Sequence, residues 1–331
     1  MHVAVIQGGP SSEAEVSRAS AAAVGDALAA AEHRVTYVEL EPSACERLRL
    51  GAFDVVFPVV HGAVGEDGSL QGVLEVLGLP YVGSDVLASA LAMDKALARV
   101  VLTAAGCRVA RGIAETRSDA LACVRRARAT LGRAVVVKPS SNGSAIGVGR
   151  FEASASDEDV AHAVESAWSL DDTVIVEEFV KGREVTCAVL DVAPDGPRAL
   201  AATEIASPMD AFYTYEARYA PGRSLHTCPA ALGTALTEKV HAVALAAHRV
   251  LGCRDLSRAD MIVADEVVLL EVNTIPGMTA TSLYPEAARV AGISFPALCD
   301  TLARNAMLRG TSPRNVAKPL PPTDLHPSKS I

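Results

Sequence analysis

The chain contains 331 residues, half of them hydrophobic, and its 30 basic and 39 acidic residues give a formal net charge of −9. This composition excludes disorder as the dominant state, and an acidic chain with 4% aromatic residues lacks the character of a nucleic-acid binder. Seven scattered cysteines without a Cys-x-x-Cys pair favour reduced thiols over disulfides or structural zinc. With no signal-like start and no apolar stretch of bilayer length, we expect a cytoplasmic protein that does not associate with membranes.

The first ninety residues alternate between short apolar runs and segments with helical spacing. In such an alternation the strands form a doubly wound parallel sheet, and ligands bind beyond the carboxyl ends of the strands. Gly8-Gly9 and His61-Gly62 both fall at such ends. We predict strands at 3–6, 34–39 and 55–60 and helices at 17–31 and 71–77.

The rest of the chain predicts a central unit, a C-terminal unit and a tail. The central unit holds a helix at 96–105, strands at 134–138 and 173–179, and a helix at 157–169. The C-terminal unit holds strands at 184–192 and 199–205, an irregular segment at 207–223, helices at 235–251 and 294–308, and a hairpin of 260–263 with 267–272. The overall prediction is an α/β chain with domains 1–93, 94–179 and 180–310 and a flexible, proline-rich tail at 311–331.

Lys138 ends a predicted strand and precedes a loop of small residues at 139–149. Glycines in such a loop allow backbone N–H groups to turn toward an anion, and the lysine adds positive charge. No Gly-Lys-Ser/Thr sequence follows, so this is not a Walker loop. Taken alone, the segment favours a flexible β-hairpin turn over an anion site.

Asp260 begins one strand of the predicted hairpin, and Glu271 and Asn273 end its neighbour. Glu271 and Asn273 are two residues apart and therefore share a face. Their oxygens suit a magnesium ion that also binds phosphate. Arg258 shares the face of Asp260 if the strand extends that far, and it could clamp phosphate or stabilise negative charge. The alternatives are capping roles for the acidic and amide residues and a surface ion pair for Arg258.

Three further segments could carry chemistry. Glu13 follows the first strand, where its carboxylate could bind a substrate ammonium group or favour the helix dipole. His61 begins a loop rich in turn-forming residues and could contact a substrate or serve only the structure. Residues 212–219 hold four of the twelve Phe and Tyr residues, which suggests either a lid that excludes water or an ordinary packed loop.

Taken together, these segments resemble the D-alanine–D-alanine ligases of the ATP-grasp superfamily. The resemblance runs in order from Val5 to about Asn305. It is carried by residues 8–17, 61–72, 93–95, 137–139, 215–219 and 271–283, which read GGPSSEAEVS, HGAVGEDGSLQG, MDK, VKP, YEARY and EVNTIPGMTATSL. This resemblance implies a three-domain ATP-grasp architecture, with ATP held between the central and C-terminal domains.

The resemblance also implies roles for individual residues in binding ATP and metal. The nucleotide phosphates would be reached by Lys95 and Lys138, and the adenine by the hinge of Glu177, Glu178, Phe179 and Val180. The ribose would be held by Glu184. Further nucleotide contacts would come from Ser144, Phe212 and Arg218. Two Mg²⁺ (or Mn²⁺) ions would be bound by Asp260, Glu271 and Asn273.

The implied reaction joins two D-alanines through an acyl phosphate, for peptidoglycan precursors. Glu13 would hold the first ammonium group beside His61, and Arg258 with the Gly277 N–H would stabilise the oxyanion. The second carboxylate would be bound by Ser282 and the Leu283 N–H. The lid would be closed by hydrogen bonds linking Glu13, Ser144 and Tyr219.

Ala145 and Arg218 depart from the family pattern, in which serine and lysine are usual. Two alternatives to a D-alanine–D-alanine ligase stay open. One is a related ligase with another amino-acid substrate, and the other is a nucleotide-binding protein without ligase activity. By analogy with the family, a homodimer is the candidate assembly.

Overall fold

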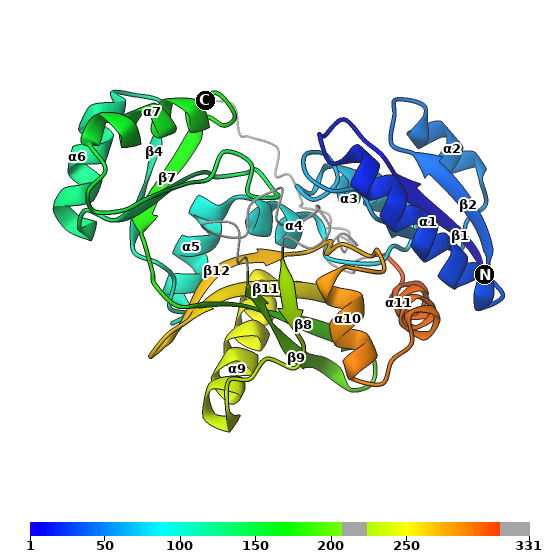
Figure 1. Cartoon of the computed structure of the whole chain (residues 1–331). Helices are drawn as coiled ribbons and strands as arrows, with labels where there is room; N and C mark the ends of the chain where they lie inside the picture. Colours follow the sequence, from blue (N-terminus) through cyan, green and yellow to red (C-terminus); the bar gives the residue numbers. More distant parts are fainter. Residues whose placement is uncertain (207–223, 312–331) are drawn as a thin grey trace, which may run out of the picture.

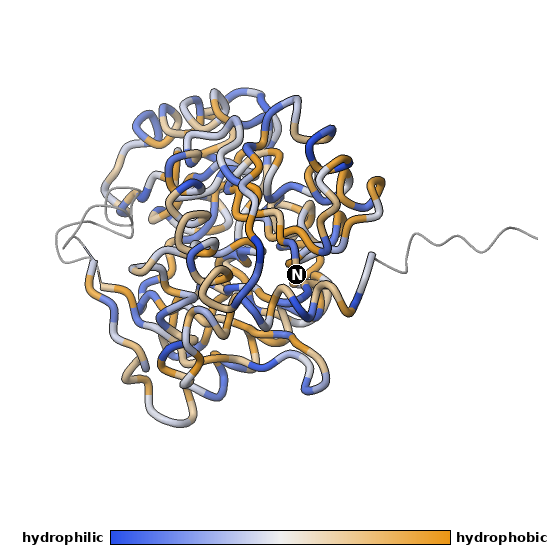
Figure 2. Tube along the Cα trace, turned by 90° about the vertical axis from the view of Figure 1, so that its right-hand side faces the viewer, coloured by the Kyte–Doolittle hydropathy of each residue, from blue (hydrophilic) through white to orange (hydrophobic). Residues whose placement is uncertain are grey.

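The computed structural model describes residues 1–206 and 224–311, and three β-sheets organise them. The N-terminal and central sheets lie on opposite sides of the molecule, and the C-terminal sheet lies between and below them (Figure 1). Helices around the sheets alternate between hydrophobic and hydrophilic residues along the chain (Figure 2), as expected for helices with one buried face. In the described ranges no helix combines the length and apolar character needed to cross a bilayer.

The N-terminal sheet is parallel, with β1 (His2–Gln7) between β2 (Arg34–Glu39) and β3 (Val55–Pro58). Side chains alternate across it, so that Val3 and Val5 pack on α1 (Ala14–Ala30) while Ala4 and Ile6 face α2 (Ala44–Leu50) and α3 (Ser69–Leu77). Helices on both faces confirm the doubly wound arrangement predicted from the sequence.

The central sheet is antiparallel in the order β4-β7-β5-β6. Valines at alternate positions of β5 and β7 form a core with the helices that cover one face. The opposite face carries Lys138 and Glu177 toward the C-terminal sheet. The elements are β4 (Gly112–Thr116), α6 (Ala120–Leu131), β5 (Val135–Pro139), β6 (Gly149–Phe151), α7 (Asp157–Trp168) and β7 (Thr173–Glu178).

The C-terminal sheet is antiparallel in the order β10-β9-β8-β11-β12. One face packs on α9 (Thr234–Leu251), and the other packs on α10 (Leu283–Val290). Its register shifts between Asp260 and Met261, which marks a β-bulge. The strands are β8 (Arg183–Val192), β9 (Gly196–Ala206), β10 (Leu225–Thr227), β11 (Asp255–Val263) and β12 (Val267–Asn273).

The last helix, α11 (Phe295–Arg309), packs beside α1 near the start of the chain (Figure 1). Leu298 and Leu302 of α11 share one hydrophobic core with Val5 of β1 and Leu190 of β8. The N-terminal sheet is therefore joined to the C-terminal sheet by a continuous core. Helices α4 (Val86–Met93) and α5 (Lys95–Ala104) connect the N-terminal sheet to the central one.

Several elements differ from the sequence-based prediction. Strand β11 begins at Asp255 rather than at Asp260, because its first residues are polar and give no apolar run. Helix α4 was not predicted; Asp94 ends it and also caps α5, so the two helices follow without a loop. Helices α2, α6 and α10 and strands β4, β6 and β10 were also missed. The predicted irregular segment at 207–223 and nearly all of the predicted tail lie outside the described residues.

Candidate functional site

Two adjoining cavities lie between the sheets. The interdomain cavity, of about 350 Å³, is lined by Glu13 and His61 of the N-terminal part and by residues of β11, β12 and the segment that follows β12. The hinge cavity, of about 150 Å³, lies between the central and C-terminal sheets. Lys95 and Glu271 line both cavities. A ligand in one cavity would therefore meet a ligand in the other at this shared wall.

The loop after β5 runs between the two cavities. Gly143 and Ser144 line the interdomain cavity, whereas Asn142 and Ala145 line the hinge cavity. Ser144 and Ala145 have φ angles of 50° and 56°, a left-handed conformation that is strained for residues other than glycine. The loop joins the antiparallel strands β5 and β6, so the hairpin alternative is correct, and the same loop also faces both cavities.

Strand alternation builds the wall of the hinge cavity. Val136 pairs with Glu177 in the β5–β7 register, and Lys138 follows Val136 on the same face. The Lys138 Nζ lies 2.7 Å from Glu177 Oε1, and Arg99 of α5 lies 3.0 Å from Glu177 Oε2. All three side chains are largely buried, so the Glu177 carboxylate is held between two cations in a setting where an unpaired charge would be costly.

The end of β7 and the first residues of β8 complete the hinge cavity. Glu178, Phe179, Val180 and Glu184 line it, together with Ile262 and Leu270 of the C-terminal sheet. The Nε of Arg111 donates a hydrogen bond of 2.8 Å to the Glu178 carboxylate. The predicted hinge residues therefore line one cavity whose walls carry both apolar and charged side chains.

Asp260 and Glu271 face each other across β11 and β12. Arg258 donates to both oxygens of Asp260, at 2.8 Å and 2.7 Å, and the Thr186 hydroxyl donates to Oδ1 at 2.6 Å. The pair of Arg258 and Asp260 is buried, which rules out the surface ion pair considered for Arg258. Lys95 Nζ lies 3.5 Å from Glu271 Oε2 and donates to the Asn142 carbonyl at 2.7 Å.

The β-bulge explains one feature that alternation alone does not. Leu270 and Glu271 are neighbours in sequence, yet both line the hinge cavity. The register shift beside Asp260 leaves an additional residue on β12 at this point, and a bulge of this kind redirects side chains. Glu271 and Asn273 line the interdomain cavity together, as their spacing predicted.

The N-terminal wall of the interdomain cavity is acidic and buried. Glu13 accepts a hydrogen bond from the Ser144 hydroxyl, a contact that links the N-terminal and central parts. Burial lowers the pKa of His61, and its Nε2 has no hydrogen-bond partner among the described residues. Burial raises the pKa of Glu66 to about 8, although the Gly62 N–H donates to its Oε2 at 2.6 Å. An unpartnered buried nitrogen at a cavity wall favours a polar ligand there.

The segment after β12 forms the opposite wall. Gly277 lies so close to Ser282 that an added Cβ would approach the Ser282 Oγ to 2.9 Å. Ser282 Oγ accepts from the Thr279 N–H at 3.0 Å and contacts the Thr279 hydroxyl at 2.8 Å. Leu283 begins α10 and lines the same cavity. The turn therefore presents small residues and a hydroxyl to the cavity.

Every predicted site residue in the described ranges lines one of the two cavities except Asp260, whose carboxylate is held by Arg258 and Thr186. Phe212, Arg218 and Tyr219 were also predicted, and they lie outside the described residues. Glu66, Arg99 and Thr186 contribute contacts that the sequence reasoning did not predict. Arg99 had a usable signal, since it lies one helical turn after Lys95 and so shares its face. Thr186 had none, because its contact with Asp260 depends on strand register.

Comparisons with known proteins give the family of the chain. The family model described as D-ala D-ala ligase C-terminus matches residues 109–304, and the model described as D-ala D-ala ligase N-terminus matches residues 44–84. A D-alanine–D-alanine ligase of Xanthobacter autotrophicus is 44% identical over 318 residues, covering 93% of this chain and 98% of its own. One of Gluconobacter oxydans is 43% identical over 316 residues, covering 93% and 100%.

Solved structures agree with these relatives. The D-alanine–D-alanine ligase of Bacillus anthracis complexed with ATP superposes with a TM-score of 0.78 at 29% identity, covering 93% of this chain and 98% of that one. The VanG D-Ala:D-Ser ligase of Enterococcus faecalis gives a TM-score of 0.78 at 30% identity, covering 92% and 99%. The ATP-grasp fold predicted from the motifs is confirmed. The chain therefore belongs to the D-alanine–D-alanine ligase family.

Proposed function

We propose that the chain joins two D-alanines into D-alanyl-D-alanine while ATP is converted to ADP and phosphate, and that this product serves peptidoglycan precursor synthesis. The observation that carries the proposal is the wall of Lys95 and Glu271 shared by the two cavities. A reaction that transfers a phosphoryl group from a nucleotide to a carboxylate needs two ligands that meet at a cationic and metal-binding boundary.

ATP occupies the hinge cavity in this proposal. The adenine lies against Glu177, Glu178, Phe179 and Val180, and the ribose against Glu184. Lys138 and Lys95 bind phosphate oxygens, and Ser144, whose hydroxyl donates to Glu13, contributes its backbone N–H. The strained conformation of Ser144 and Ala145 supports a backbone role for this loop, because Ala145 lacks a side-chain donor. Phe212 and Arg218 complete the nucleotide contacts in the family pattern.

The residue types beside the shared wall fit magnesium. Glu271 of that wall supplies a hard carboxylate oxygen and Asn273 an amide oxygen, and hard oxygen ligands are those that Mg²⁺ prefers. The Asp260 carboxylate lies behind them, where Arg258 binds both of its oxygens, and it would join the site only if this pairing loosened. The described ranges contain no cluster of three His, Cys, Asp or Glu side chains, so phosphate oxygens and water would complete the coordination. Two Mg²⁺ (or Mn²⁺) ions held there would supply positive charge that offsets the negative charge of the phosphoryl group.

Two bond-forming steps then follow. A carboxylate oxygen of the first D-alanine attacks the γ-phosphorus, ADP leaves, and an acyl phosphate forms. The amine of the second D-alanine attacks the acyl carbon, phosphate leaves, and the nitrogen loses a proton. The residues mainly position the reactants and exclude water, because the acyl phosphate would otherwise hydrolyse.

The interdomain cavity supplies groups for each step. Glu13 binds the first ammonium group, and the unpartnered Nε2 of His61 supports a substrate contact beside it. Arg258 and the Gly277 N–H stabilise the tetrahedral oxyanion. Ser282 and the Leu283 N–H bind the second carboxylate. The hydrogen bond between Ser144 and Glu13 supports the proposed link that Tyr219 completes.

The test is phosphate release that depends on ATP and magnesium, with mass analysis of the product. D-alanine alone, L-alanine, and D-lactate paired with D-alanine serve as substrates. D-alanyl-D-alanine formed only from D-alanine is the expected result. Turnover with a different amino acid and none with D-alanine would contradict the proposal and favour the alternative family ligase. ATP binding without any turnover would favour a nucleotide-binding protein.

Two family properties belong to the same proposal. We infer a homodimer and a cytoplasmic location by analogy with bacterial relatives of this family. Sedimentation equilibrium of the purified chain tests the first, and fractionation of the source cells tests the second.

A further inference from the structure

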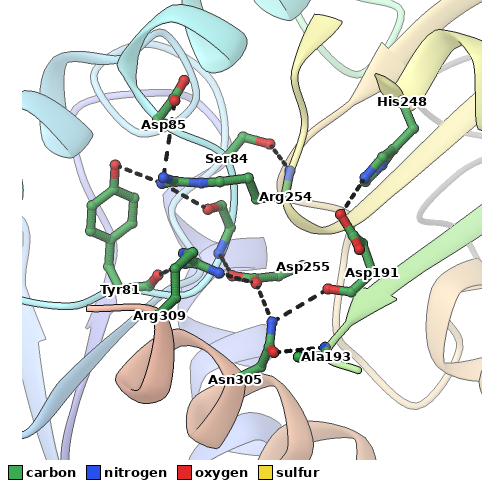
Figure 3. Close-up of polar contacts among 11 residues, drawn as sticks. Tyr81, Ser84, Asp85, Asp191, Ala193, His248, Arg254, Asp255, Asn305 and Arg309 are labelled. Atoms are coloured by element: carbon green, nitrogen blue, oxygen red, sulfur yellow. Dashed lines mark hydrogen bonds and ion pairs between the residues drawn. The ribbon is translucent and has the colours of Figure 1, made fainter. Parts of the chain in front are cut away.

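A polar network outside the linings of both cavities joins segments that are distant in sequence (Figure 3). It links the start of β11 to residues 81–85 and to the last helix, and Asn305 of that helix extends it to the end of β8. Its centre is Asp255, the first residue of β11, which is 1% exposed. Asp255 has a φ angle of 60°, a left-handed conformation that residues other than glycine mostly avoid. A buried carboxylate in a strained backbone requires compensating contacts.

The carboxylate of Asp255 receives donors from two directions. The Gly83 N–H donates to Oδ2 at 2.7 Å, across 172 residues of sequence. From α11, Asn305 Nδ2 donates to Oδ1 at 2.8 Å, and Arg309 binds both carboxylate oxygens. The side chain thus ties the N-terminal part, the last helix and the start of β11 together.

Two arginines strengthen the same junction. Arg309 Nη2 also donates to the Tyr81 carbonyl at 2.8 Å. Arg254, the residue before Asp255, donates to the Tyr81 hydroxyl at 3.1 Å, and its N–H donates to Ser84 Oγ at 3.3 Å. The segment 81–85 is therefore held at several points against the beginning of β11.

The two joined segments lead directly to the interdomain cavity. Residues 81–85 follow the N-terminal sheet, whose loops carry Glu13 and His61, and they precede α4, which ends just before Lys95. In β11, Arg258 lies three residues after Asp255. The hinge cavity, by contrast, lies between the central and C-terminal sheets, and the network does not join those two.

We propose that Asp255 is a positioning residue that fixes Glu13 and His61 relative to Arg258 and thereby sets the affinity for the amino-acid substrates. This inference rests on the proposed ligase function. The competing explanation is that Asp255 serves only the backbone turn at the start of β11. The two explanations predict different results for Asp255→Gly, because glycine adopts a positive φ without strain but has no carboxylate.

The experiment compares Asp255→Gly and Asp255→Asn with the wild type. The quantities are the KM values for D-alanine and ATP, kcat, and the dissociation constant of ADP with Mg²⁺ measured by calorimetry. Asp265→Asn is the matched control, because Asp265 is exposed in the turn at the other end of the same strand. Arg309→Lys provides a second disruption that leaves β11 unchanged, since lysine keeps the charge but loses the bidentate contact.

We expect the KM for D-alanine to rise roughly tenfold in Asp255→Gly, as small displacements of positioned groups have large effects. Asp255→Asn and Arg309→Lys should show smaller rises. ATP KM and ADP affinity should stay within about twofold in all of them, as in Asp265→Asn.

Wild-type kinetics in Asp255→Gly would overturn the inference and assign Asp255 to the backbone turn. Equal losses of ADP and D-alanine binding would also overturn it, because they would show a general structural role. If Asp255→Gly does not fold, Arg309→Lys decides by the same two criteria. A wild type without dipeptide formation would defeat the proposed function and this inference together, whereas an active wild type with unaffected variants defeats the inference alone.

Discussion

The hinge cavity and the interdomain cavity share Lys95 and Glu271 but are constructed differently. The hinge cavity takes Lys138 and Glu177 from paired strands of one sheet, where side-chain alternation sets their direction. The interdomain cavity takes its walls mainly from loops that follow strands of all three sheets. A wall formed by paired strands of one sheet is determined by local pattern, whereas walls formed by loops of different sheets depend on how the sheets are held together.

Each cavity has a buried carboxylate in its lining, and the two carboxylates have different partners. Glu177 in the hinge cavity lies between Lys138 and Arg99. Glu66 in the interdomain cavity receives the Gly62 N–H, and burial raises its pKa to about 8. Glu66 thus lacks a paired cation among the described residues, and burial outweighs its one backbone donor and favours its neutral form.

The largest expected effect is at the shared wall. Glu271→Gln removes one negative charge from the proposed metal site and should lower kcat by about 10³-fold, the scale of losing a main electrostatic contact in a reaction of this kind. ATP-dependent phosphate release with D-alanine measures it. Glu238→Gln, exposed on α9, is the control. Near-normal turnover in Glu271→Gln would contradict the metal assignment.

Glu66 lines the interdomain cavity, and its raised pKa should make the free energy of unfolding depend on pH. Its pKa is raised from 4.5 to about 8, so the folded chain binds a proton that the unfolded chain has released within this range. Stability from this group is complete below pH 4.5 and is lost as the pH rises toward 8, by about 1.4 kcal/mol per pH unit.

Glu66→Gln keeps an acceptor for the Gly62 N–H and cannot ionise. The difference in unfolding free energy between Glu66→Gln and wild type should therefore increase in favour of the variant between pH 4.5 and 8. Urea denaturation across this range measures it, with Glu46→Gln on the exposed face of α2 as the control. A difference that does not change with pH would refute the raised pKa.

A substitution of Arg99 tests whether the hinge cavity can be changed without affecting the interdomain cavity. Arg99→Met removes one of the two cations at Glu177 and should raise the KM for ATP roughly tenfold, because Lys138 would then be the one of the two left for the buried carboxylate and would be less available to phosphate. The KM for D-alanine should change by less than about twofold. Arg126→Met, which removes a partner of Glu115 at the surface, is the control. Equal changes in both KM values would show that the two cavities are not independent.

The smallest expected effect concerns the end of the chain. The contacts of Arg309 with Asp255 and Tyr81 are complete one residue before Gly310. Ending the chain after Gly310 should therefore change Tm by no more than about 1 °C, whereas ending it after Leu308 should lower Tm by about 2–4 °C or more. Differential scanning calorimetry of both truncations measures this. A large drop in the first would show that residues 311–331 contribute to the fold.

The sequence alone determined which residues share a face and which segments carry the family pattern. Alternation in the strands predicted that Glu271 and Asn273 lie together, and the ordered motifs predicted the family and the ATP-grasp fold. These features follow from local periodicity and from residue types that only a few backbone conformations or chemistries require.

Tertiary structure decided the rest. The start of β11 at Asp255, the bulge beside Asp260 and the contact of Thr186 with Asp260 depend on pairing between strands that are far apart in sequence. The same holds for the burial of Glu66, which sets its pKa. The physical reason is that a residue's own pattern specifies the direction of its side chain, whereas its partner and its exposure to water are fixed only when distant segments pack together.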